Sequence, residues 1–280
     1  MNINYAAIDW VTATTRKDSV GLRWFEIFQS FVDERNLKNL YNERWSNGYY
    51  SGISCEGLSW GYNDRLGYII IASSEDADWL WPKIEIASTR ITRLDLCVDC
   101  LYESPRDLAG TQYDYITATL LPKQRKYTHF KNSAGGQTLY VGSRHSQQYG
   151  RLYDKGAESS QAPMGRLWRY EVEYKKPLSG MVGEHLRMQD ADKLESEIIN
   201  RVSNWFYERG VLSADHIREG AVKPILVQKT ITSVEKKLAW LRTQVAPTVH
   251  QLIEAGWGDD VLHSLLLQPS TIANILNSED

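Results

Sequence analysis

The sequence has few cysteines, and they form no paired framework. Its 280 residues include three, Cys55, Cys97 and Cys100. A small, odd number of thiols excludes a disulfide-stapled secreted domain and favours a reducing compartment. Cys97 and Cys100 form a C-x-x-C pair, but no second pair completes a zinc site. Because residues three apart on a strand face opposite sides, we interpret both cysteines as structural.

Long apolar runs and closely spaced histidines are also absent. No segment approaches the roughly 18 consecutive apolar residues that indicate a membrane-spanning helix. Residues 1–10 lack the basic and apolar regions of a signal peptide, so we expect a cytoplasmic protein with no membrane partner. No two of the six histidines are two, three or four residues apart, which excludes a metal site of locally paired histidines.

The chain carries no overall excess of positive charge. Its formal net charge of −3 is not typical of a nucleic-acid-binding protein. Positive charge is nevertheless concentrated between residues 123 and 155, where seven basic residues accompany one acid, Asp154. A local basic patch of this kind can bind phosphates. A solvated hairpin face explains the same charges equally well.

The apolar periodicity predicts a chain in two parts. Residues 1–176 alternate between strand and helix patterns, and residues 177–280 are expected to be helical, either packed on the first part or forming a small C-terminal domain. We therefore predict an α+β fold, with an antiparallel sheet, helices packed on one face, and a C-terminal helical region. Strands are expected at 4–14, within 48–73, and at 91–100, 126–131, 137–142, 149–155 and 165–175. Helices are expected from Asp18 or Ser19 to residues 36–39, at 75–81, 104–120, 190–209 and 232–244, and in shorter segments after Pro247.

Several acidic side chains fall on the polar face of the predicted strands. Asp95 and Asp99 are four apart, which places them on the same face but about 13 Å apart. A single ion would therefore use one of them with Glu171 or Glu173 of another strand, and carboxylates select Mg²⁺ or Mn²⁺. The alternative, which spacing alone favours, is that each aspartate forms a cross-strand salt bridge with Arg93 or Arg169.

Two tyrosines lie within the basic region. On one strand, Tyr149, Arg151, Tyr153 and Lys155 would share a face. A tyrosine is a weak nucleophile unless cations stabilise its phenolate, and this neighbourhood supplies cations. The alternative is that both tyrosines are half-buried packing residues of the strand.

Five segments resemble, in order, the successive blocks of the replication initiation factor family. They are residues 8–12, 92–99, 138–144, 151–156 (Arg-Leu-Tyr-Asp-Lys-Gly) and 169–173. Residues 237–241 and 245–247 resemble the end of the phage-type members. This family comprises rolling-circle initiators of plasmids and phages together with relaxases of integrative elements.

The resemblance implies a DNA nicking and joining endonuclease in residues 1–176. A tyrosine would attack the scissile phosphate at a replication origin, remain linked to the 5′ phosphate and release a 3′-OH primer. The matching positions give Tyr153 as nucleophile, Tyr149 as a possible second one, Lys155 and Arg151 as phosphate-binding residues, and Asp95, Asp99 and Glu171 as ligands of Mg²⁺ or Mn²⁺.

The resemblance also implies partners. Origin DNA, single-stranded or folded into a hairpin, would contact Arg93, Lys126, Lys131, Arg144 and Arg151; a host replicative helicase and a homodimer are further expectations. The alternative is a catalytically inactive regulator or recruitment factor that binds origin DNA on the same fold. The joint presence of tyrosine, acids and lysine favours the enzyme. A small-molecule enzyme lacks support because the sequence has no glycine-rich phosphate loop.

Overall fold

The computed structural model describes most of the first 212 residues. These are residues 2–37, 41–45, 50–101, 126–131, 136–158 and 166–212, together with 250–251 and 253–256. The chain divides into two compact units, residues 1–225 and 226–280. The helices expected at 104–120 and 232–244 lie outside the described residues, and the domain boundary expected near residue 176 stays a prediction. Residues 250, 251, 253 and 254 are helical.

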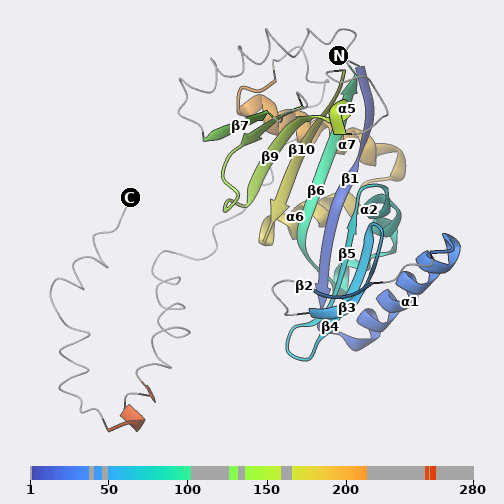
Figure 1. Ribbon diagram of the computed structural model, residues 1–280, viewed down its shortest axis with the longest axis vertical. Coiled ribbons are helices and arrows are strands. Elements are labelled where there is room, and N and C mark those ends of the chain that lie inside the picture. Colours follow the sequence, from blue (N-terminus) through green and yellow to red (C-terminus); the bar gives the residue numbers. More distant parts are fainter. Residues whose placement is uncertain are drawn as a thin grey trace. The chain divides into compact units, whose positions relative to one another are not determined.

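Within the described residues, ten strands form one antiparallel sheet (Figure 1). The spatial order is β2-β3-β4-β5-β1-β6-β10-β9-β8-β7, with the two longest strands, β1 and β6, side by side near its centre. The strands are β1 (Asn2–Thr15), β2 (Tyr41–Trp45), β3 (Tyr50–Cys55), β4 (Leu58–Asn63), β5 (Gly67–Ser73), β6 (Arg90–Leu101), β7 (Tyr127–Lys131), β8 (Gln137–Val141), β9 (Gln148–Asp154) and β10 (Leu167–Lys175).

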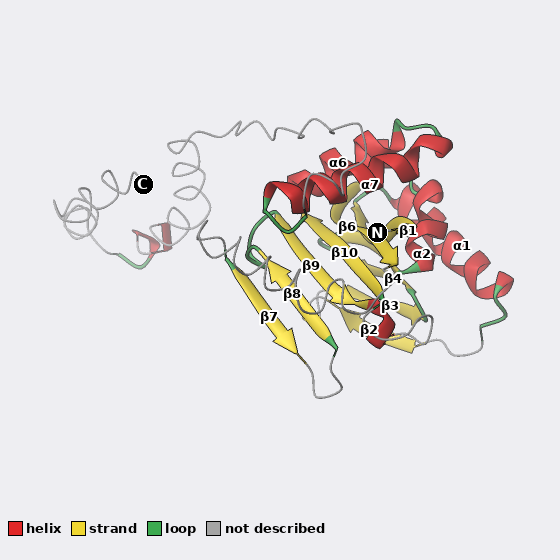
Figure 2. Cartoon of the chain, turned by 90° about the horizontal axis from the view of Figure 1, so that it is seen from above, coloured by secondary structure: helices red, strands yellow, loops and turns green. Residues whose placement is uncertain are grey.

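Helices cover one face of this sheet, which confirms the predicted fold class (Figure 2). The three longest lie along that face, and α2 follows the end of β5. The helices are α1 (Asp18–Glu34), α2 (Glu75–Leu80), α5 (Lys155–Glu158), α6 (Pro177–Arg187) and α7 (Ala191–Glu208), with 3₁₀ turns at Trp81–Lys83 and Ile86–Ser88. No helix in the described ranges has both the length and the apolar content needed to span a bilayer.

The period-two alternation of the strands divides each one between two faces. On the helix-covered face, β6 and β10 bury apolar side chains such as Leu96 and Val172. Trp205 of α7 packs directly over Gly150 of β9, where an added Cβ would overlap the indole ring. Close packing of this kind fixes α7 against this face of the sheet. We call the opposite face, which α1, α6 and α7 do not cover, the helix-free face.

Strand β1 departs from regular pairing at Asp9. Ile8 pairs with Leu96 of β6 and Trp10 with Asp95, so Asp9 is an extra residue in a β-bulge. Two residues of a bulge oppose one on the neighbouring strand. Asp9 and Trp10 can thus both face the helix-free side, where Asp9 contacts Arg169 and the Trp10 ring lies 4.3 Å from the Arg93 guanidinium carbon.

Three local expectations were wrong or incomplete. Lys155 was expected on the strand face with Tyr153, but β9 ends at Asp154 and Lys155 begins α5. Lys17, without a side-chain cap, occupies the position before α1 that was expected for Asp18 or Ser19. Helix α6 was not separately predicted, although Pro177 stands in its first turn, where proline is favoured.

Candidate active site

The helix-free face of β1, β6, β10 and β9 is lined by charged side chains. The strand register brings residues together that are distant in sequence: Asp99 is opposite Arg169, Asp95 is opposite Glu173, and Glu171 is opposite Arg151. Asp95, Asp99 and Glu171 are all buried. Buried carboxylates need charged or hydrogen-bonding partners, and for these three the partners are arginines.

Arg169 joins two aspartates from two different strands. Its Nε and Nη2 donate to the two carboxylate oxygens of Asp99, at 2.6 and 2.8 Å, and its Nη1 donates to Asp9 Oδ1 at 2.5 Å. The paired hydrogen bonds to Asp99 are the bidentate geometry in which a guanidinium fits a carboxylate best. Since Asp9 reaches Arg169 only through the bulge of β1, the backbone irregularity and this cluster depend on each other.

A second cluster is centred on Asp95, which is 0% exposed. Arg93 donates to both oxygens of Asp95, at 3.0 and 2.5 Å, and Arg151 donates to Oδ2 at 3.1 Å. The same Nη2 of Arg151 also donates to Glu171 Oε1. Arg151 therefore bridges Asp95 and Glu171. The cross-strand salt bridge expected as the alternative is present between Asp99 and Arg169, whereas Arg93 pairs with Asp95 within β6 and the cross-strand partner of Asp95 is Arg151.

Burial changes the acidity of this cluster. It raises the pKa of Glu171 to about 8, with Asp9 and Asp95 adding to the effect and Arg151 opposing it. Burial also raises the pKa of Asp95, against the opposing effect of Arg93. A carboxyl group with a pKa near 8 can hold or release a proton close to neutral pH, which suits a general acid or base.

Tyr153 lies on this face, opposite Arg169 in the pairing of β9 with β10. It is partly exposed, unlike the acids beside it. Burial raises the pKa of its phenol well above the usual range; Glu171 raises it further, and Arg169 lowers it. The phenol is thus neutral at pH 7, and its use as a nucleophile requires a neighbouring group that takes its proton.

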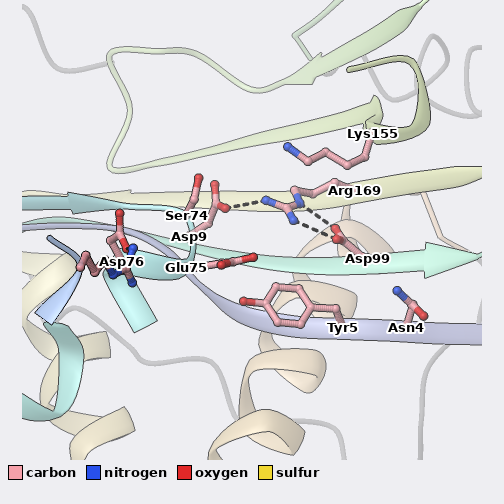
Figure 3. Close-up of a pocket in the computed structure, with 10 residues that line it drawn as sticks. Asn4, Tyr5, Asp9, Ser74, Glu75, Asp76, Asp99, Lys155 and Arg169 are labelled. Carbon is pink, nitrogen blue, oxygen red and sulfur yellow. Dashed lines mark hydrogen bonds and ion pairs between the residues drawn. The ribbon is translucent and has the colours of Figure 1, made fainter. Parts of the chain in front are cut away.

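A polar pocket with a volume of about 480 Å³ opens beside the Arg169 cluster (Figure 3). Asp9, Asp99 and Arg169 form one wall, Tyr5 and Asn4 of β1 another, and Lys155 reaches in from the start of α5. Its remaining lining residues are Arg35, Ser74, Glu75 and Asp76. The Nζ of Lys155 lies 5.9 Å from the ring centre of Tyr153, so Tyr153, which does not itself line the pocket, is near the Lys155 side of it.

The predicted metal ligands do not form a set that fits an ion. Both oxygens of Asp95 and of Asp99 accept hydrogen bonds from arginines, and Glu171 is paired with Arg151. Asp99 belongs to a different arginine cluster from the other two. Across the described ranges, no three acidic, histidine or cysteine side chains are grouped as metal ligands. An ion could reach these carboxylates only after a guanidinium had moved.

Tyr149, the second predicted tyrosine, is in a packing environment. It is 5% exposed and stacks on Tyr140 of β8, with ring centres 5.9 Å apart and an angle of 14° between the rings. The guanidinium carbon of Arg144 lies 5.8 Å from its ring centre, and the Nζ of Lys175 lies 5.9 Å away. Tyr153 is therefore the more accessible of the two phenols.

The basic residues predicted to contact DNA fall into two groups. Arg93 and Arg151 pair with buried acids on the sheet, so their charge is largely used within the protein. Lys126, Lys131 and Arg144 are exposed, on or next to the β7–β8 hairpin. Only the second group offers its charge to a ligand without rearrangement.

Sequence reasoning gave no site role to Asp9, Tyr5 or Arg169, which line the pocket. Arg169 was named only as a salt-bridge partner. The sequence did contain an indication that Asp9 has a special role, since it is a single acid within an otherwise apolar strand pattern. Its side chain could not be assigned to a face, because a bulge interrupts the alternation on which that assignment depends.

Comparisons with known proteins agree on one group. The family model described as replication initiation factor matches residues 89–266. A protein of Bacillus subtilis (strain 168) named "Putative DNA relaxase NicK" is 27% identical over 138 residues, which cover 43% of this chain and 39% of that protein. The solved structure of a rolling circle replication initiator protein from Geobacillus stearothermophilus aligns with a TM-score of 0.50 and 17% identity, covering 74% of this chain and 85% of that one; it supports the fold.

Proposed function

Because the chain belongs to the replication initiation factor family, we propose that it is a rolling-circle replication initiator that nicks one DNA strand with Tyr153 as nucleophile. The observation that carries this proposal is the position of Tyr153. It is a partly exposed phenol on the charged, helix-free face, beside a pocket that contains Arg169 and Lys155.

The proposed reaction is a transesterification at phosphorus. The Tyr153 hydroxyl oxygen forms a bond to the scissile phosphorus while the bond from phosphorus to the 3′ oxygen breaks. The products are a 5′-phosphotyrosine and a 3′-OH, and joining is the reverse reaction. The phenol loses a proton and the leaving 3′ oxygen gains one. Lys155 would stabilise the charge that develops on the phosphoryl oxygens once it leaves its exposed partner Glu158, whereas the donors of Arg169 are occupied by Asp9 and Asp99.

Glu171 is the proposed acceptor of the phenol proton. Its charge acts on Tyr153, and because its pKa is about 8, the ionised fraction that can accept a proton increases as the pH rises toward 8. The same carboxyl group could return the proton during joining. We assign no step to a metal ion, because the predicted ligands are paired with arginines; the requirement for Mg²⁺ or Mn²⁺ stays a prediction.

The proposed substrate is origin DNA in single-stranded or hairpin form. A helicase partner and a homodimer also stay predictions. The test is a nicking assay with single-stranded oligonucleotides that tile the protein's own replicon, plus supercoiled origin DNA, in Mg²⁺, Mn²⁺ or EDTA. A covalent adduct is detected on a denaturing gel and mapped by mass spectrometry.

Tyr153→Phe is expected to remove the adduct while DNA affinity stays within a few-fold of the wild-type value, and Tyr149→Phe is the matched control. An adduct on the Tyr149 peptide would keep the reaction and transfer the nucleophile. Binding of origin DNA by the wild-type protein without any adduct would reject the enzyme in favour of the inactive origin-binding factor.

A further inference from the structure

An aromatic residue at the edge of the sheet stands in line with Tyr153. Phe130 of β7 pairs with Thr138 of β8, and Thr138 pairs with Tyr153 of β9. Residues paired across neighbouring strands point to the same face, so Phe130 lies on the helix-free face. Two strand spacings separate it from Tyr153, a distance of about 10 Å.

Phe130 is strongly exposed for its type, at 56%. Edge strands usually carry charged or polar residues, which discourage pairing with other chains. One exposed phenylalanine alone has no special meaning. Here, however, a second aromatic residue from the neighbouring strand lies on the same face.

That second residue is Tyr140 of β8, which pairs with Arg151 of β9. Its ring is partly exposed and is supported from one side by Tyr149. The guanidinium carbon of Arg144 lies 5.7 Å from its centre. We call Phe130, Tyr140 and Arg144 the aromatic platform.

The surroundings of the aromatic platform are positively charged. Residues 126–153 contain no aspartate or glutamate. Lys126 and Lys131, close to the two ends of β7, and Arg144 of the platform are exposed. Of these cations, Arg144 contacts the platform itself. Lys131 lies next to Phe130 on β7 and so faces the other side of the sheet, and Lys126 lines a pocket with Glu208 and Arg209.

We propose that single-stranded DNA next to the scissile phosphate crosses the β7–β8 hairpin, with bases stacked on Phe130 and Tyr140 and a phosphate near Arg144. This inference rests on the proposed function for the position of the scissile phosphate. The spacing of about 10 Å between Phe130 and Tyr153 allows one or two nucleotides to lie between the phosphate and the Phe130 ring.

The chemistry favours single strands over a duplex. Exposed rings can stack only on bases whose faces are accessible, and a duplex buries the faces of its bases against one another. Stacking is also tolerant of sequence, because every base has a π face. The platform thus supplies affinity and positioning rather than recognition of an origin sequence.

The test compares Phe130→Ala with the wild-type chain by fluorescence anisotropy, using a labelled 20-nucleotide oligothymidine and a labelled duplex of equal length. Stacking of one base corresponds to a loss of about 5-fold to 150-fold in single-strand affinity, with little change for the duplex. Phe130→Trp should keep the single-strand affinity. Tyr207→Ala is the matched control, since Tyr207 is an exposed aromatic residue of α7 on the helix-covered side.

The outcomes separate this inference from the proposed function. Unchanged single-strand affinity in Phe130→Ala overturns the aromatic platform, even if Tyr153 forms the adduct. An equal loss for the duplex also overturns it, because the loss then reports general damage. A selective loss in Phe130→Ala supports the platform, even if the wild-type protein forms no adduct.

Discussion

The two faces of β6 show two ways of burying a strand. Leu96 and Asp95 are neighbours in sequence and both are 0% exposed. Leu96 lies on the face that packs under helices, where apolar contact excludes water. Asp95 lies on the face without helices and is covered by the guanidinium groups of Arg93 and Arg151. On the first face stability depends on how closely apolar side chains pack together. On the second face it depends on the pairing of opposite charges.

The largest expected effect comes from removing a guanidinium on the charged face. Arg169→Ala would leave Asp99 buried and unpaired, and we expect the free energy of unfolding to fall by about 3–5 kcal/mol. Chemical denaturation measures it. The double variant Arg169→Met with Asp99→Leu should lose less than the single variant, because no carboxylate of that pair stays uncompensated. Equal losses would show that the pairing contributes nothing on this face.

A cavity on the apolar face should have a somewhat smaller effect. Leu96→Ala is expected to lower the free energy of unfolding by about 2–4 kcal/mol, because the contacts under the helices are lost and the space fills only in part. Leu96→Met, which keeps the volume, should cost less than about 1.5 kcal/mol. DNA affinity per folded molecule should not change in either variant. A change would mean that the two faces are coupled.

The two faces of β6 and its neighbours should also differ in how the free energy of unfolding depends on pH. The folded-state pKa of Glu171, about 8, lies above the ordinary glutamate pKa of 4.5. Its contribution to stability is therefore fully present below pH 4.5 and is lost as the pH rises through about 8. The slope is at most about 1.4 kcal/mol per pH unit. Denaturation at a series of pH values measures the slope, which Glu171→Gln should flatten and Leu96→Met should leave intact. A steep slope that persists in Glu171→Gln would assign the titration to another group.

The smallest effect is expected where a salt bridge is exposed to solvent. Lys155 contacts Glu158 at 2.6 Å, and the Glu158 side chain is 59% exposed. Glu158→Gln should change the free energy of unfolding by less than about 0.5 kcal/mol, because water and salt screen such pairs. Denaturation at low and high salt tests this. A loss above 1 kcal/mol would place Glu158 among the structural charges of the helix-free face.

Much of the division of the strands into a charged and an apolar face could be predicted from the sequence. Alternation with period two placed Arg93, Asp95 and Asp99 on one face and Leu94, Leu96 and Val98 on the other, and the register agrees. The antiparallel sheet and the helices on one face followed from the same periodicities. These features are local, since each depends only on residues a few positions apart.

The partners of the charged residues could not be predicted in the same way. Asp99 pairs with Arg169, 70 residues further along the chain, and Asp9 with the same arginine across 160 residues. Such pairs depend on strand order and on the bulge, which no local pattern specifies. Lys155 was misplaced for a local reason, because β9 ends one residue before it.

The bulge at Asp9 makes chain length adjustable at that position of β1. In the regularly paired parts of β1, deletion of a residue would send every side chain before or after the deletion to the opposite face. At Asp9 it would not, because Ile8 and Trp10 already pair with consecutive residues of β6. A chain shorter by this one residue could keep the same alternation on both sides, and would give up the carboxylate that Arg169 holds at the pocket.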